Sequence, residues 1–187
     1  MEVKQLNDHL NNEKITLRKV SIEMAASIFN YIDEDRERLD RFLPWVQYIK
    51  TLEDEKKFIK SSDSDWEQGL EFNYCIFDNT DSTYVGNIGV HSISWKDDRA
   101  ELGYWVLGKY EGKGYISEAV KTLELHLFTM GFNRVEIRCS DLNEKSARVP
   151  IRCGYTFEGI SRKDVIEKGQ YRDTKNFSKL QSEKDKL

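Results

Sequence analysis

The chain has 187 residues and a formal charge of −4 at pH 7. A single domain spanning 1–187 is expected from this length, and it can bury a core without disulfide or metal staples. The acidic balance argues against a nucleic-acid partner, which leaves a basic footprint, and suits an amine-bearing one. No apolar run approaches the roughly 20 residues that cross a bilayer, so we expect a cytoplasmic protein without a membrane partner.

The cysteines are odd in number and scattered through segments with strand or helix patterns: Cys75, Cys139 and Cys153. Scattered cysteines of this kind are typical of buried thiols in a reducing compartment. The alternative, a nucleophilic cysteine, has no neighbouring partner pattern to support it.

The start of the chain combines a short strand with helices. Residues 1–13 are polar and lack an apolar signal core, so we expect a flexible start. Apolar and polar side chains alternate over 15–20, which predicts a strand, and Ser21 is a candidate N-cap for the helix that follows. The densely charged segment 33–41 is typical of a solvated helix face with local ion pairs.

A proline and a threonine divide the next part of the chain. Pro44 ends the charged helix, and Thr51 opens a second helix that runs to about Gly69. Strands then follow in succession and predict an antiparallel meander, over 72–77, 84–93 and from about Ala100 onward.

From residue 101 the order changes to strand, helix, strand. A strand over 101–107 precedes a helix whose apolar positions begin at Ile116, and 134–139 forms the next strand. Such a crossover returns its second strand parallel to the first, so the predicted fold class is α/β (α+β), with a mixed sheet and helices on both faces. The chain closes with a short helix over 143–152, a hairpin formed by 155–161 and 171–180, and a charged tail over 181–187 that is expected to be flexible.

The stretch 101–130 reads as strand, glycine loop and helix, and it carries the main functional signal. Gly112 and Gly114 remove side chains from the turn, so the free N–H groups at the positive end of the helix can approach an anion. Lys113 and Ser117 add a cation and a hydroxyl, and a phosphate or pyrophosphate is the expected guest. The alternative is that both glycines merely turn the chain. The spacing fits neither a kinase or GTPase loop nor a dinucleotide fingerprint.

Two runs in this stretch resemble the acyl-CoA-binding loop of the GNAT superfamily of N-acetyltransferases. They are Gly-Tyr-Trp-Val at 103–106 and Glu-Gly-Lys-Gly-Tyr-Ile-Ser-Glu-Ala at 111–119. Further segments are similar to the RimJ/RimL branch, which acetylates ribosomal-protein N-termini: Phe-Leu-Pro-Trp-Val at 42–46, Asn-Arg-Val-Glu-Ile-Arg-Cys at 133–139, Asn143 with Ser146, and Gly-Tyr-Thr-Phe-Glu-Gly at 154–159. The resemblance covers nearly the whole chain.

The resemblance implies a GNAT fold with about seven, mostly antiparallel strands. Its two central parallel strands, here 101–107 and 134–139, would separate in a V to admit the pantetheine arm of acetyl-CoA. Acetyl-CoA is the implied cosubstrate, and no metal is implied. Backbone N–H groups of Val106 or Leu107 would face the thioester carbonyl. The remaining implied cofactor contacts come from the loop and from a later helix: Glu111, Gly112, Lys113, Gly114, Tyr115, Ile116, Ser117, Asn143 and Ser146.

The acid that protonates the departing thiolate is assigned through the same resemblance. Many GNAT enzymes carry a tyrosine at the position of Pro150, which cannot donate a proton. The RimJ/RimL serine near the CoA sulfur maps onto Ser146, and Asn143 would hold pantetheine or start the helix. The alternative makes Asn143 an ordinary N-cap and Ser146 a surface hydroxyl. The family pattern also differs at Glu111, at Ile116 and at Ile151, and Glu111 is a poor neighbour for a pyrophosphate unless it points away.

A carboxylate base would assist the reaction, because an N-terminal amine has a pKa near ~8 and is mostly protonated at neutral pH. Glu101, at the start of the donor strand, is the first candidate for base and acceptor contact; the alternative is an exposed strand-end carboxylate. Asp164 is the second candidate. His91 and His126 are less attractive, and His9 lies in the expected flexible start.

In the RimJ/RimL branch the early helices and their connection line the acceptor site. Trp45 and Tyr48 are therefore candidates for acceptor contact, or else ordinary core aromatics. The expected partners are acetyl-CoA, an amine acceptor such as a ribosomal-protein N-terminus, and optionally a second copy in a homodimer. The competing hypotheses are an acetyltransferase of small amines and a CoA-binding sensor with little catalysis, the latter motivated by Pro150 and Glu111.

Overall fold

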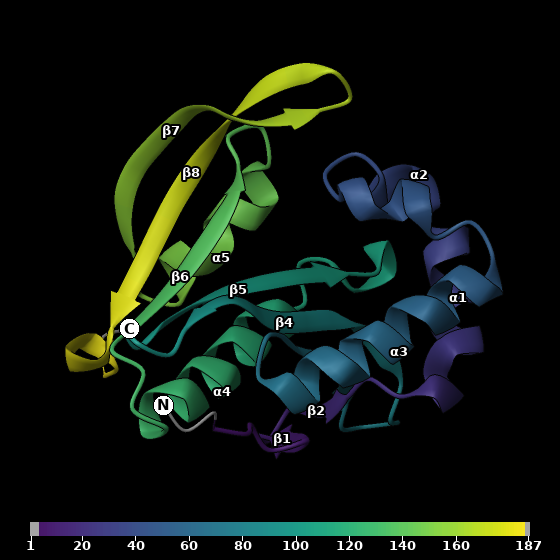
Figure 1. Cartoon of the computed structure of the whole chain (residues 1–187), viewed down its shortest axis with the longest axis horizontal. Coiled ribbons are helices and arrows are strands. Elements are labelled where there is room, and N and C mark those ends of the chain that lie inside the picture. The colour runs from purple at the N-terminus through teal and green to yellow at the C-terminus, as the bar shows by residue number, and fades with distance from the viewer. Residues whose placement is uncertain (1–3, 186–187) are drawn as a thin grey trace.

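The computed structural model describes residues 4–185 and shows one sheet flanked by helices (Figure 1). The expectations for residues 1–3 and 186–187, at the ends of the chain, lie outside the described residues. Eight strands follow the order β1-β2-β3-β4-β5-β6-β8-β7. Their bounds are β1 His9–Asn11, β2 Ile15–Lys19, β3 Phe72–Asp78, β4 Tyr84–Ser94, β5 Arg99–Val106, β6 Arg134–Ser140, β7 Thr156–Glu167 and β8 Gln170–Leu180.

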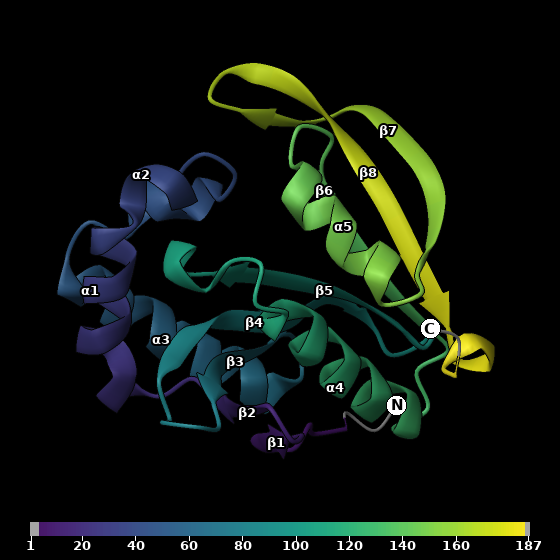
Figure 2. The ribbon, with the colours of Figure 1, turned by 180° about the vertical axis from the view of Figure 1, so that it is seen from behind.

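The helices lie on both faces of this sheet, as expected. Figure 1 shows α3 in front of the strands, and the reverse view in Figure 2 shows α4 in front of them. The α-helices are α1 Ala25–Glu34, α2 Arg36–Leu39, α3 Leu52–Gln68, α4 Tyr115–Thr129 and α5 Glu144–Arg152; the 3-10 helices are η1 Ile22–Met24, η2 Pro44–Tyr48, η3 Gly108–Tyr110 and η4 Gln181–Glu183. None of the helices within residues 4–185 has the length and apolar character needed to cross a bilayer.

The chain ends differ from the sequence-based expectation. Residues 9–11, inside the segment expected to be flexible, form β1, which pairs antiparallel with β2. This strand makes the sheet eight-stranded, where about seven strands were expected. The preceding Leu6 is buried in the main core, so burial of an apolar side chain orders this polar segment. At the other end, residues 181–183 form η4.

Local signals account for several boundaries. Thr51 caps α3 in a capping box with Asp54, and Gly69 ends the helix in the left-handed conformation, both as predicted. Ser21, in contrast, precedes a 3-10 turn and makes no side-chain cap bond. The closing hairpin turns at Lys168 and Gly169, both at positive φ, as a two-residue hairpin turn requires.

Two apolar clusters fix the two faces of β5. Leu102 packs into the cluster that contains Leu123 of α4, whereas Trp105 packs against the cluster that contains Ile59 of α3. Because side chains alternate along a strand, Tyr104 lies on the α4 side and Glu101 on the α3 side.

The parallel strands β5 and β6 separate soon after they meet. They pair only over Arg99–Glu101 and Arg134–Glu136, and the following residues of both strands pair with other neighbours instead. The sheet therefore opens between β5 and β6, and the V-shaped split is confirmed (Figures 1 and 2).

Candidate active site

The open edge of β5 offers backbone donors to the split. Leu107 donates its N–H to Val85 C=O at 2.9 Å, so this N–H is used inside the sheet. Backbone groups of successive strand residues point to opposite sides, and Val106 C=O accepts from Arg38 Nη2 at 2.6 Å. The N–H of Val106 therefore faces the split, and the expectation that Leu107 could serve equally as a donor is corrected.

The glycine loop before α4 has the geometry of an anion site. Gly112 and Gly114 have φ values of 73° and 83°, which only glycine adopts without strain. A Cβ at Gly112 would meet no atom within 4 Å, so the space above the loop is open. Lys14 donates its ammonium to Lys113 C=O at 2.6 Å and adds positive charge there. The turn and the helix start thus fit a pyrophosphate.

The side chains that follow the loop serve packing. Tyr115 and Ile116 are each 8% exposed and belong to the main core. Ser117 is equally buried, and its hydroxyl accepts from Arg152 Nε at 3.4 Å. Of these three residues, only the backbone N–H groups are placed to reach a bound anion.

The carboxylate of Glu111 is neutralised by two cations. It pairs with Arg38 Nη1 of α2 at 2.7 Å and with Lys145 of α5. Arg38 also pairs with Asp35, whose carboxylate accepts from Gly108 N–H at 2.8 Å. The negative charge of Glu111, expected to be unfavourable beside a pyrophosphate, is therefore compensated. Its ion pairs also connect α2, the loop and α5.

Ser146 lies at the start of α5, on the α4 side of the split. Asn143 Oδ1 accepts from Ser146 N–H at 3.1 Å, so Asn143 is the N-cap of the helix. The Ser146 hydroxyl donates to Tyr104 OH at 3.4 Å, and Tyr104 OH donates to Ser146 C=O at 3.1 Å. Burial raises the pKa of Tyr104 well above its usual value, so the phenol keeps its proton.

Tyr104 is a site residue that the sequence reasoning missed. It stands within the Gly-Tyr-Trp-Val run at 103–106, but its contact with Ser146 joins positions 42 residues apart in the chain. The alternation over 101–107 was the available signal, because it puts Tyr104 on the face opposite Glu101. Cys139 lies close by, and the Ser146 hydroxyl opposes the rise that burial causes in the pKa of that thiol.

Glu101 lies on the other face of β5 and is not an exposed strand-end carboxylate. Its side chain is 12% exposed and its Oε1 is 4.0 Å from Nε2 of His91. Burial is the largest effect and raises the pKa of Glu101. His91 and Arg138 lower this pKa, and the carboxylates of Glu136 and Asp164 raise it further. Asp164, the second candidate base, is paired with Arg138 and so is already engaged.

The predicted acceptor aromatics lie on η2. Trp45 is half-buried, with its ring centroid 5.9 Å from that of Trp105, which lies on the same face of β5 as Glu101, beyond Gly103. Tyr48 is 71% exposed. The structure thus brings Trp45, but not Tyr48, into packing contact with the strand that carries Glu101.

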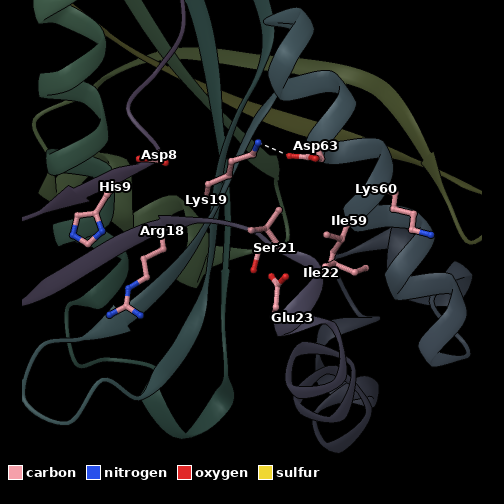
Figure 3. A pocket seen from close by; sticks show the side chains of 11 residues that line it. Asp8, His9, Arg18, Lys19, Ser21, Ile22, Glu23, Ile59, Lys60 and Asp63 are labelled. Atoms are coloured by element: carbon pink, nitrogen blue, oxygen red, sulfur yellow. Dashed lines mark ion pairs between the residues drawn. The ribbon is translucent and has the colours of Figure 1, made fainter.

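A surface hollow lies apart from this site. It has a volume of about 530 Å³, it lies between β1, β2 and α3, and Lys19 and Asp63 form an ion pair across it (Figure 3). Its lining carries charges of both signs and includes none of the candidate site residues. It therefore does not compete with the split as the reaction site.

The arrangement separates two chemical roles across one strand. A thioester carbonyl placed in the split at β5 would meet backbone N–H donors, and Ser146 and Tyr104 lie on its α4 side. A carboxylate with a raised pKa lies on the α3 side. Such a site suits acyl transfer from a phosphate-bearing thioester to an amine that arrives from the α3 side.

Comparison with known families agrees with this reading. Residues 14–156 match the family model described as "Acetyltransferase (GNAT) domain". The chain belongs to the GNAT acetyltransferase family. As a member, it is an acetyl-CoA-dependent N-acetyltransferase.

Several relatives match this chain over most of their length. The protein YdaF of Bacillus subtilis (strain 168), provisionally named as a ribosomal N-acetyltransferase, is 28% identical over 92% of this chain and 94% of its own length. The ribosomal-protein-serine acetyltransferase of Escherichia coli (strain K12) is 25% identical over 90% of this chain and 94% of its own. The microcin C7 self-immunity acetyltransferase MccE, solved with acetyl-CoA and AMP, has a TM-score of 0.86 at 25% identity and covers 90% of this chain and 93% of its own.

Proposed function

We propose that this GNAT enzyme acetylates the α-amine of a protein N-terminus, with ribosomal proteins as the acceptor class. The observation that carries the proposal is the position of Glu101, a largely buried carboxylate on the α3 side of the split, opposite Ser146 across β5. Relatives with ribosomal acceptors in their names support the acceptor class. The same setting favours a cytoplasmic location, where ribosomal proteins are made and where Cys75, Cys139 and Cys153 stay free.

The residues divide the reaction into proton and charge steps. Glu101 accepts a proton from the acceptor ammonium, because a raised pKa brings its basicity closer to that of an amine. The neutral amine then attacks the thioester carbonyl. The N–H of Val106, with the other backbone N–H groups of β5 that face the split, stabilises the oxyanion. The Ser146 hydroxyl turns its single proton from Tyr104 OH to the departing sulfur and donates a hydrogen bond to it, while Tyr104 OH keeps its own hydrogen bond to Ser146 C=O.

The ion pairs of Glu111 weaken the case for a CoA-binding sensor. That hypothesis rested partly on an acidic residue beside the pyrophosphate, and Arg38 and Lys145 compensate this charge. A small-amine acceptor is the competing activity, and the test below separates it from a peptide acceptor.

The test is turnover with acetyl-CoA and a panel of acceptors. We expect hexapeptides with free Ser, Ala or Met N-termini to gain one acetyl group, measured by mass spectrometry, and the same peptides with blocked N-termini to gain none. Glu101→Gln should lower kcat/KM by about a hundredfold or more, as loss of a general base does. Glu71→Gln, a matched change at an exposed position before β3, should leave it unchanged. Faster turnover of spermidine or aminoglycosides than of every peptide would overturn the proposed acceptor.

A further inference from the structure

His91 of β4 lies directly beside Glu101, although the reaction described above does not use it. The two residues are cross-strand partners in the antiparallel pairing of β4 and β5, so their side chains share the α3 face of the sheet. Nε2 of His91 is 4.0 Å from Oε1 of Glu101. This distance is too long for a hydrogen bond, but a small side-chain movement or one bridging water would close it.

Two neighbours hold the imidazole in this position. The other ring nitrogen, Nδ1, lies 3.2 Å from Oγ of Ser92, a residue at φ 51° in the bulge that follows His91. Gly103 leaves the space that the ring occupies, because a Cβ at this position would lie 2.8 Å from Nε2 of His91. The contact at Nδ1 and the space left by Gly103 therefore orient the ring with Nε2 toward Glu101.

The other charged groups around Glu101 leave His91 as the partner that can exchange a proton. Arg138 of β6 is engaged with Asp164 of β7, and Glu136 of β6 is paired with Arg134. His91 carries the only imidazole among the groups that act on the Glu101 carboxylate within the described residues. Its side chain is 34% exposed, so the imidazole reaches water.

We propose that His91 is a positioning residue that takes the acceptor's proton from Glu101 and passes it to water. The inference rests on the proposed role of Glu101 as the proton acceptor. The acceptor ammonium loses two protons in all: the first moves to Glu101, then to the imidazole of His91, and then to solvent. The second ends on the thiolate when the carbon–sulfur bond breaks and the carbon–nitrogen bond forms. Glu101 thus returns to its carboxylate form for the next turnover.

The first measurement needs no acceptor. Carbon-13 NMR of labelled glutamate carboxyls, with the Glu101 signal assigned from Glu101→Gln, follows the ionisation of Glu101 against pH. His91→Gln should move the midpoint to higher pH, because it removes the side chain whose interaction lowers the pKa of Glu101. Gly103→Ala should move it in the same direction, because its methyl group displaces the ring while the imidazole is retained.

The second measurement is the pH profile of kcat/KM with the best acceptor of the panel. We expect the acid limb of His91→Gln to shift to higher pH together with the NMR midpoint, and its plateau to fall about tenfold because the relay is lost. KM for acetyl-CoA should not change. His9→Gln is the matched control, because His9 is exposed on β1 at the far edge of the sheet.

An unchanged NMR midpoint in His91→Gln overturns the inference, and so does an unchanged plateau. Absence of turnover with every amine by the parent protein would instead count against the proposed function. The NMR midpoint still decides in that case whether His91 acts on Glu101.

Discussion

Glu55 shows how one buried carboxyl can make stability depend on pH. It lies in the first turn of α3, it is only 2% exposed, and burial raises its pKa to about 7. A carboxyl in the unfolded chain titrates near ~4.3, so the folded state holds the proton more tightly. This contribution to stability is present below the unfolded pKa and is lost as the pH rises to about 7.

We therefore expect the free energy of unfolding to fall by roughly 3 kcal/mol between about pH 4 and pH 7 because of this group. Glu55→Gln should remove this part of the dependence of the free energy of unfolding on pH. At pH 8 the variant should be more stable than the parent protein. Urea unfolding at pH 5 and pH 8 measures both, with Glu67→Gln, at an exposed position of the same helix, as the control. An identical slope in Glu55→Gln would show that the carboxyl is hydrated or paired in solution.

At the scale of elements, α5 links stability to the site. Its first turn is capped by Asn143, and the same hydrogen bond fixes the backbone N–H of Ser146. Because Ser146 also contacts Tyr104 of β5, the cap sets the distance between α5 and the open edge of that strand. Loss of the cap should therefore affect folding and catalysis together.

Asn143→Ala should lower the free energy of unfolding by about 1 kcal/mol, the usual cost of a lost N-cap. We also expect a lower kcat, because the Ser146 hydroxyl is then held less firmly. Asn143→Asp keeps an acceptor oxygen at the cap and is the matched variant, which should restore stability and most of the rate. Equal kcat values for Asn143→Ala and the parent would show that the Asn143 cap does not affect catalysis.

The glycine loop before α4 is the second element with a direct test. Gly114→Trp puts a large side chain at φ 83°, at the turn where a pyrophosphate would meet the helix N-terminus. Isothermal titration with acetyl-CoA should show saturable binding by the parent and none by the variant. Circular dichroism is needed to show that the variant is folded. Equal binding by a folded variant would place the phosphates elsewhere.

For the molecule as a whole, an ion pair joins two arms: the β7–β8 hairpin and the segment around α2. Lys168 at the tip of the β7–β8 hairpin pairs with Asp40, which follows α2, at 2.6 Å. The hairpin tip lies next to α2 in both views (Figures 1 and 2). Both arms flank the α3 side of β5, since Asp164 of the hairpin acts on Glu101 and α2 packs with the cluster around Trp105.

Both partners are partly exposed, so the ion pair should matter more for acceptor binding than for stability. We expect Lys168→Asp to raise KM for a peptide acceptor by about two- to fivefold, a change that corresponds to a surface pair of up to ~1 kcal/mol. The double variant Lys168→Asp with Asp40→Lys reverses the charges and should restore KM. A lower KM in the single variant would mean that the ion pair obstructs the acceptor.

The sequence alone determined the features that depend on neighbouring residues. Periodicity placed strands β2 to β8, although the predicted 155–161 covers only the first part of β7, and the cap at Thr51, the cap at Asn143 and the glycines of the loop were identified. These are short-range effects, because alternation, capping and φ preferences act within a few residues. The resemblance to the GNAT superfamily supplied the V-shaped split, which periodicity does not contain.

Only the tertiary structure decided which of these pieces meet. Burial of Leu6 orders the polar start next to β1, and β8 rather than β7 lies beside β6. The contact between Tyr104 and Ser146 and the burial of Glu101 both arise where strands separate and helices cover them. Long-range packing excludes water at those points, and that exclusion, not the residue type, gives a carboxylate a raised pKa.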